Sequence, residues 1–292
     1  MKSILPVFVL FFLLATACRP KPIGIDVAQA GEQIAIASTA LDAHTVIISA
    51  SYSITSLYNL EETGKGQDSG VAATNILLDS ALVTISDGTA TDTLTKVSPG
   101  LYRTISMNLV SGQFYTLKVR DHKSGQTVVA STQYQPPLVI DSMKPFVDRR
   151  PRDTAVQLIM DMRDDRPGTD YYLMAYDKIN PATIPSAIGS ANFAILNSDV
   201  QKRVEVFSDA EAIDGRITKT FNLEIGPRDT LFVQYGRITK GYYDFLASYK
   251  RSGSILTQAT AEPVTLPTNI IAGLGYFSLY DSRWEGFVLR EY

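Results

Sequence analysis

The feature that most constrains this chain is a period-two alternation of apolar and polar residues, interrupted by Gly and Pro turns. Apolar side chains occupy alternate positions within residues 46–54, 115–119 and 156–162. A half-buried β-strand requires this pattern, because successive side chains point to opposite faces of a sheet. The sequence therefore predicts a mainly β protein.

Turn signals divide the first half into short strands. Residues 82–86 end in Asp87-Gly88, a hairpin-type turn, and residues 91–97 offer a returning strand. Further strands are expected at 101–104 and 127–130. Strands spaced by about 8–12 residues with such turns are typical of a β-sandwich.

The second half resumes the strand pattern. We expect strands at residues 139–142, 171–176, 221–225 and 231–235, the last two joined through the turn at 226–229. One segment departs from the period of two. Apolar residues recur there at helical spacing, at Tyr242, Phe245, Leu246 and Tyr249. With Thr239 as N-cap and Gly253 as stop, the spacing predicts a short amphipathic helix over 240–251, packed on a sheet.

The tract Gln135-Pro136-Pro137 interrupts the strands and marks the predicted domain boundary. We expect an N-terminal immunoglobulin/transthyretin-like β-sandwich over residues 32–136. A second β-rich domain with one short amphipathic helix would follow over residues 137–292. Residues 59–70 are polar and glycine-rich and predict a long loop in the first domain.

The N-terminus has the layout of a lipoprotein signal peptide, expected over residues 1–17. Lys2 precedes an apolar run of about ten residues, shorter than the roughly 20 that span a membrane. Small residues and then Cys18, the only Cys of the chain, follow the run. This arrangement is similar to a lipobox, in which the Cys becomes the acylated N-terminus, although Ala15 holds the place where Leu is usual. The alternative is an ordinary signal peptide cut near Ala17, which leaves a free thiol.

Residues 18–31 contain Pro20, Pro22 and Gly24 and predict a short tether between anchor and folded part. Two or three acyl chains, such as palmitate, anchor a protein stably, whereas one chain binds membranes only marginally. Cys18 is therefore the predicted lipid-attachment site.

The order of several segments resembles a Bacteroidota lipoprotein family catalogued as domain of unknown function forty-two forty-nine. The segments are Cys18 and residues 81–88, 97–102, 112–119, 139–142, 170–172 and 268–277. The resemblance implies a protein anchored by lipid in the outer membrane, on its periplasmic or cell-surface face. It also implies association with TonB-dependent receptors, and it carries over no catalytic residues.

Composition argues against several kinds of site. The net charge of −3, from 27 Lys+Arg and 30 Asp+Glu, argues against a nucleic-acid partner. A single Cys and two His argue against an internal disulfide and a Cys- or His-rich metal centre. An acidic cluster falls at one turn, at Asp161, Asp164, Asp165 and Asp170. It lacks calcium-loop spacing and Arg163 intrudes, so we expect a solvated hairpin turn and no metal.

Catalytic motifs are equally scarce. Ser stands beside Asp at residues 68–69 and 79–80, without the nucleophile elbow of hydrolases. A Ser-His-Asp triad with His44 or His122 stays open, because its members need not be close in sequence. We expect no catalytic residues and no cofactor.

Aromatic residues crowd the last 51 residues of the chain. Most are expected in a core, while Trp284 and Tyr280 are candidates for a partner or ligand surface. The glycines of Gly273-Leu274-Gly275 predict that the backbone turns there or closely approaches another strand. We expect residues 268–287 to belong to the second domain's core or its partner-facing edge.

These features predict a non-enzymatic outer-membrane lipoprotein, an accessory or binding component of a TonB-dependent uptake system. The alternative is a surface-anchored hydrolase acting on glycans or peptides. That alternative requires a cleft with two carboxylates about 5–10 Å apart.

Overall fold

The computed structural model describes residues 33–52, 77–149, 154–164, 166–179, 204–252 and 265–292. This part of the chain is built from strands in four sheets together with the helix α6 (Lys240–Ser252), which confirms the mainly β prediction. No helix among these residues is long and apolar enough to cross a membrane. The signal peptide, the tether with Cys18 and the loop at 59–70 lie outside the described residues.

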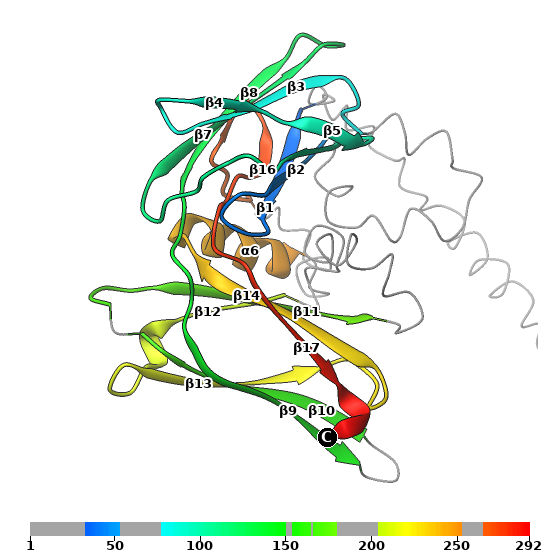
Figure 1. The fold of residues 1–292 in the computed structure, drawn as a ribbon, viewed down its shortest axis with the longest axis vertical. Helices are drawn as coiled ribbons and strands as arrows, with labels where there is room; N and C mark the ends of the chain where they lie inside the picture. The colour runs from blue at the N-terminus through cyan, green and yellow to red at the C-terminus, as the bar shows by residue number, and fades with distance from the viewer. Residues whose placement is uncertain (1–32, 53–76, 150–153, 165, 180–203, 253–264) are drawn as a thin grey trace, which may run out of the picture. The chain divides into compact units, whose positions relative to one another are not determined.

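Two five-stranded sheets form the first sandwich (Figure 1). One has the order β16 (Leu274–Tyr276), β1 (Ala35–Ala40), β2 (Val46–Ser51), β6 (Leu101–Thr104), β5 (Thr95–Ser98). The other has the order β15 (Ile270–Ile271), β8 (Thr127–Gln133), β7 (Phe114–Asp121), β3 (Ala81–Ser86), β4 (Thr91–Thr93). The alternating side chains of β3 and β7 face those of β1 and β2 across one apolar core.

The returning strand expected at 91–97 is split between the two sheets. β4 pairs with β3, as the Asp87-Gly88 turn predicts, but β5 pairs with β6 in the opposite sheet. Leu94, between the two strands, is buried in the core. The chain therefore crosses from one sheet to the other at the point where an apolar residue turns inward.

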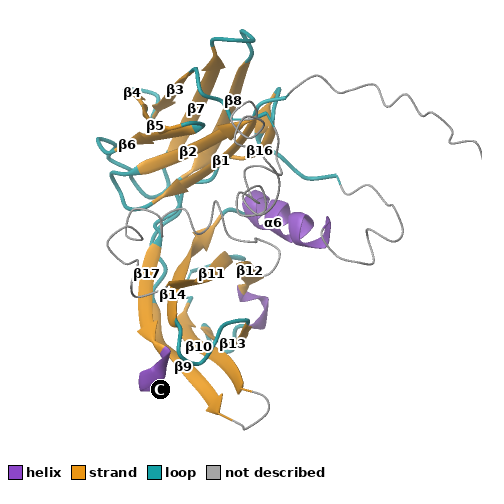
Figure 2. Ribbon diagram, turned by 90° about the vertical axis from the view of Figure 1, so that its right-hand side faces the viewer, coloured by secondary structure: helices purple, strands orange, loops and turns teal. Residues whose placement is uncertain are grey.

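The second sandwich combines a three-stranded and a four-stranded sheet (Figure 2). The smaller has the order β13 (Arg216–Leu223), β10 (Thr154–Arg163), β9 (Ile140–Arg149). The larger has the order β12 (Val204–Ser208), β11 (Tyr171–Ile179), β14 (Thr230–Ile238), β17 (Arg283–Val288). Their facing side chains, among them Leu158, Met160 and Val233, form a second core.

The turn at 226–229 joins different sheets rather than neighbouring strands. The sequence predicts a strand on each side of it, and the structure places these strands as β13 and β14, which do not pair. Phe221 and Leu231 both point into the second core, from opposite sides. The turn is therefore a connection across the sandwich.

Helix α6 confirms the prediction for residues 240–251. Thr239 caps it, with its Oγ1 accepting a hydrogen bond from the Tyr242 N–H at 3.3 Å. The four predicted apolar residues, Tyr242, Phe245, Leu246 and Tyr249, are buried.

The apolar face of α6 lies between the two sandwiches (Figures 1 and 2). On one side it packs against Ala35, Ala37 and Ile47 of β1 and β2, and on the other against Leu173 of β11. Strand β2, expected to be half-buried, is consequently buried on both faces. The expectation fails because the alternation within one strand does not show what covers its outer face.

The C-terminal segment belongs to both sandwiches. β15 pairs with β8 and β16 runs parallel to β1, whereas β17 pairs with β14. Gly275 has φ +85°, and a Cβ at that position would collide with the backbone carbonyl of Ile36. This confirms the predicted close approach of two strands.

Residues 32–292 cluster as one compact unit, so the predicted boundary between residues 136 and 137 stays a prediction. Core positions for residues 268–287 are confirmed at Phe277, Leu279 and Phe287, which are buried. Strands β15 and β16, however, pair with strands of the first sandwich, whereas we expected the whole segment in the second domain.

Candidate functional site

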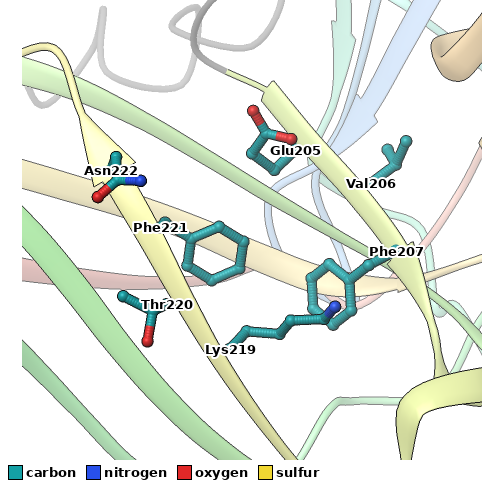
Figure 3. A pocket seen from close by; sticks show the side chains of 7 residues that line it. All are labelled: Glu205, Val206, Phe207, Lys219, Thr220, Phe221 and Asn222. Atoms are coloured by element: carbon teal, nitrogen blue, oxygen red, sulfur yellow. The ribbon is translucent and has the colours of Figure 1, made fainter.

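An open groove lies between two edge strands of the second sandwich, β12 and β13. Within the described residues, β12 pairs only with β11 and β13 only with β10. The groove has a volume of about 400 Å³ (Figure 3). Its lining residues are Glu205, Val206, Phe207, Lys219, Thr220, Phe221 and Asn222.

Two phenylalanine rings form the floor of the groove. Phe207 comes from β12 and Phe221 from β13, and their ring centroids lie 5.8 Å apart. Each residue is 8% exposed and packs into the second core. The floor is therefore a rigid extension of that core.

Charged side chains stand at inward-facing positions on both edge strands. Glu205 is two residues from Phe207 and Lys219 two residues from Phe221, so each shares a strand face with a floor residue. The Lys219 ammonium lies 5.6 Å from the centroid of the Phe207 ring. The Glu205 carboxylate forms an ion pair of 2.8 Å with Lys250 of α6. Inward-facing charges on edge strands oppose the addition of a further strand.

Polar groups line the rim on the β13 side. The Asn222 Oδ1 accepts a hydrogen bond of 2.9 Å from the Gln157 Nε2. The Asn222 side chain lies on the opposite face of β13 from Phe221, because successive side chains of a strand point to opposite faces. Its hydrogen bond with Gln157 therefore links β13 to β10 on the outer face of the three-stranded sheet.

A buried ionic cluster lies behind the floor. The side chain of Arg237 on β14 is 6% exposed, and its terminal nitrogens lie 3.6 Å from Asp164 and 3.4 Å from Asp170. The guanidinium also lies 5.8 Å from the centroid of the Tyr172 ring, whose hydroxyl donates a hydrogen bond to Asp164. Tyr172 in turn contacts Phe207, with ring centroids 5.3 Å apart. The cluster thus supports the groove floor from behind.

Burial shifts the titration of this cluster. Burial raises the pKa of Asp170 above its ordinary value, although the nearby Arg237 charge acts in the opposite direction. Burial and the hydrogen bond to Asp164 raise the pKa of the Tyr172 hydroxyl. Tyr172 is therefore a hydrogen-bond donor at neutral pH, which suits a structural role.

The cluster corrects the solvated turn predicted for the acidic residues. Asp164 and Asp170 are held by Arg237 because the turn folds onto the end of the sandwich. Asp161 accepts hydrogen bonds from Ser142 and Thr218, and Asp165 lies outside the described residues. Among the residues that the structure describes, no group of three or more His, Cys, Asp or Glu could hold a metal ion.

The predicted surface residues Tyr280 and Trp284 have different environments. Tyr280 is fully buried, which corrects the prediction: Gly236 leaves room for its ring in the apolar cluster around α6. Trp284 is half-buried, with its ring centroid 6.3 Å from that of Phe232. A surface role of Trp284 stays a prediction.

The two histidines lie at separate turns. The His44 Nδ1 is 2.7 Å from the Met107 carbonyl oxygen. The backbone N–H of His122 donates a hydrogen bond to the Ser80 carbonyl oxygen. The neighbouring Asp79 carboxylate forms an ion pair of 2.8 Å with Lys96. These contacts are structural ones, and Asp68 and Ser69 lie outside the described residues.

Sequence reasoning missed the groove and the cluster behind it. Glu205 and Lys219 come together only because two sheets pack face to face. Arg237 carried a signal, since it is the single charged residue of the largely apolar strand β14. A charge at such a position requires a buried partner.

Comparison with known proteins gives one family. The family described as "Domain of unknown function (DUF4249)" matches residues 21–284. Among solved structures, a "putative carbohydrate binding protein" from Bacteroides uniformis ATCC 8492 is 10% identical, covering 55% of this chain and 79% of that chain. The TM-score is 0.21, so this likeness carries no argument about fold or ligand. No curated protein matches the chain.

Proposed function

Because the chain belongs to the DUF4249 family, we propose that it is a non-enzymatic binding lipoprotein of the outer membrane. It would serve as an accessory component of a TonB-dependent uptake system. Cys18 would carry the lipid anchor, on either the periplasmic or the cell-surface side. The anchor would keep the binding site close to a receptor in the same membrane.

The groove between β12 and β13 is the observation that carries this proposal. Its volume of about 400 Å³ lies within the range of ligand sites, roughly 300–1,000 Å³. Two Phe rings form its floor, and the Lys219 ammonium lies beside the Phe207 ring. The arrangement suits binding.

The alternative, a surface hydrolase, finds less support in the groove. Glycoside hydrolysis commonly requires two carboxylates that flank the scissile bond. Among the described lining residues, Glu205 is the single carboxylate, and Lys250 holds it in an ion pair. The paired carboxylates Asp164 and Asp170 lie in the buried cluster behind the floor, where Arg237 lies between them.

Isolation of the native protein from membranes tests the proposed function. We expect a TonB-dependent receptor to be enriched when the tagged full chain is purified in mild detergent and its partners are identified by mass spectrometry. A second tagged lipoprotein of the same membrane, expressed at the same level, serves as control. Equal recovery of receptors with both proteins would contradict the proposal.

The anchor is tested separately by Cys18→Ala. The variant should appear in the aqueous fraction, because an acyl chain contributes most of the membrane affinity of such proteins. Cell fractionation with immunodetection measures this. A variant that is still extracted only by detergent would show that Cys18 is not the anchor.

A further inference from the structure

We propose that the outer face of the sheet β15-β8-β7-β3-β4 lies on the membrane surface, where Lys118 and Arg120 contact the phosphate groups of anionic lipids. This inference rests on the proposed function as a lipid-anchored protein and adds the surface that the anchored chain turns toward the lipid. Helix α6 packs against the other sheet of the first sandwich, so this sheet is the layer farther from the helix (Figure 1).

The alternation of β7 places two cations on this face. The inward positions Tyr115, Leu117 and Val119 are buried in the first core, so Lys118 and Arg120 point outward, and both residues are exposed. The other outward positions of the five strands hold apolar residues, Thr, Ser and Gln. Within these described strands, the face therefore carries two positive charges and no acidic residue.

The two cations are not neutralised by neighbouring side chains. Among the residues that the structure describes, no ion pair involves Lys118 or Arg120. On the three-stranded sheet, in contrast, Arg163 of β10 forms an ion pair of 2.8 Å with Asp141 of β9. The chain as a whole has a net charge of −3, so attraction to an anionic surface favours the orientation that brings this positive face toward it.

Exposed apolar side chains lie beside the cations. Arg120 is opposite Leu82 of β3, which is 44% exposed. Lys118 is opposite Val129 of β8, and Val129 is opposite Ile271 of β15, which is 71% exposed. Neighbouring strands lie about 4.8 Å apart, so each exposed apolar side chain is within about 10 Å of a cation. This mixture suits the membrane interface, where charged headgroups border the apolar acyl region.

The predicted tether keeps the first sandwich near the lipid. Residues 18–31 precede β1, the first strand of that sandwich, which begins at Ala35. A fully extended segment of this length spans at most about 50 Å. The anchor therefore holds the sandwich at a high effective concentration near the headgroups, and two cations are then sufficient to orient it.

A second copy of the chain fits this face less well than a lipid surface. A two-fold symmetric contact would place Lys118 and Arg120 against the same residues of the second copy, and like charges repel. A small soluble anion would leave Leu82 and Ile271 in water. A lipid surface supplies phosphate groups for the cations and an apolar boundary for these two side chains.

Vesicle co-sedimentation tests the inference without the lipid anchor. The mature chain, residues 18–292 with Cys18→Ala, is mixed with vesicles of phosphatidylglycerol and phosphatidylcholine, or of phosphatidylcholine alone. We expect about 25-fold tighter binding to the anionic vesicles, at about fivefold for each of the two cations. Added salt should weaken this binding, because it screens the charges.

Substitutions assign the binding to this face. Lys118→Gln combined with Arg120→Gln should weaken binding to anionic vesicles about 25-fold, whereas Lys118→Arg combined with Arg120→Lys keeps the charges and the affinity. Arg103→Gln combined with Lys144→Gln is the matched control, since it removes two exposed cations from other sheets, and it should bind as the parent does. All four residues are exposed, so the melting temperatures should stay close to that of the parent.

Three results would overturn the inference. They are equal binding to the two kinds of vesicle, parental binding by the variant of Lys118 and Arg120, and an equal loss in the variant of Arg103 and Lys144. The last result would show that the overall charge of the chain acts and not this face. None of them affects the recovery of a receptor with the tagged chain or the cell fractionation of Cys18→Ala, so the inference and the proposed function can fail independently.

Discussion

The two faces of the sheet β12-β11-β14-β17 are covered in different ways. On one face Leu173, Ala175 and Ile238 pack against the aromatic side of α6. On the other face lie Tyr172 and Arg237, opposite the three-stranded sheet β13-β10-β9. One face is covered by apolar contacts, whereas the other combines apolar contacts with a buried ionic cluster.

The two faces differ in their suitability for ligand binding. Tyr242, Phe245 and Tyr276 contact one another on the helix face, with ring centroids 5.4–6.2 Å apart. Such packing stabilises the fold. The opposite face ends at β12 and β13, which are edge strands within the described residues, and charged and aromatic side chains line a groove there. The two faces should therefore respond differently to substitution.

Truncation after Leu266 should have the largest effect on stability. It removes β15, β16 and β17, which pair with β8, β1 and β14. Each buried side chain among Tyr276, Phe277 and Leu279 contributes roughly 1.5–3 kcal/mol, against a total stability of roughly 5–15 kcal/mol. We expect loss of the cooperative melting transition in circular dichroism, or aggregation.

Truncation after Leu289 is the matched control. It keeps all three strands and the buried Leu289, and it removes only three exposed residues. Its melting temperature should lie close to that of the parent. If the longer truncation also melts as the parent does and stays monomeric, the C-terminal segment is peripheral.

Phe245→Ala tests the helix face. The ring is fully buried between the two sandwiches, and removing it should cost about 3–5 kcal/mol. Urea denaturation measures the loss.

Lys240→Ala is the control on the same helix. It breaks the exposed 2.6 Å pair with Asp244 and should leave the urea midpoint close to that of the parent. If both variants lost the same free energy of unfolding, the apolar face of α6 would not be what holds the helix in place.

Arg237→Leu tests the opposite face. It leaves the carboxylates of Asp164 and Asp170 without their buried cation, which should cost about 3–5 kcal/mol. The triple variant with Asp164→Asn and Asp170→Asn removes the charges together and should recover part of that loss. In contrast, neutralising charged residues should not restore the stability lost in Phe245→Ala. A triple variant less stable than Arg237→Leu would contradict the ionic interpretation.

The sequence predicted those helices and strands whose apolar stripe lies within the element itself. The helix 240–251 and the strands around 115–119 and 156–162 follow from spacing alone, because each carries its own apolar stripe. The burial of β2 on both faces could not be predicted, since its outer cover comes from α6, about 190 residues later. The same holds for the parallel pairing of β16 with β1.

The groove could not be predicted from sequence patterns either, because its lining residues lie on strands of different sheets. Glu205 and Lys219 are 14 residues apart (219 − 205) and stand on strands of different sheets. Their proximity depends on how those sheets pack. Tyr280 was predicted at a surface, whereas it is buried because Gly236, about 44 residues earlier, leaves room for its ring.

The smallest expected effect concerns Asp121, a buried carboxylate of the first sandwich that contrasts with Asp170. Burial alone would raise the pKa of Asp121, but hydrogen bonds from Ser124 and Tyr52 outweigh it and lower the pKa to about 2. A folded-state pKa below the unfolded value of 3.8 stabilises the protein above pH 4, and this stabilisation is lost as the pH falls toward 2.

Asp121→Asn should therefore destabilise the chain by about 1–2 kcal/mol at pH 6, with the difference from the parent vanishing near pH 2. Urea denaturation at several pH values measures this dependence. Asp79→Asn, which removes an exposed carboxylate paired with Lys96, should cost at most about 0.5 kcal/mol at pH 6. For Asp170 the sign is reversed: its pKa is raised, so its ionisation weakens the fold as the pH rises through that pKa. A loss in Asp121→Asn that is the same at pH 6 and pH 2 would show that the side chain acts through packing and not through its charge.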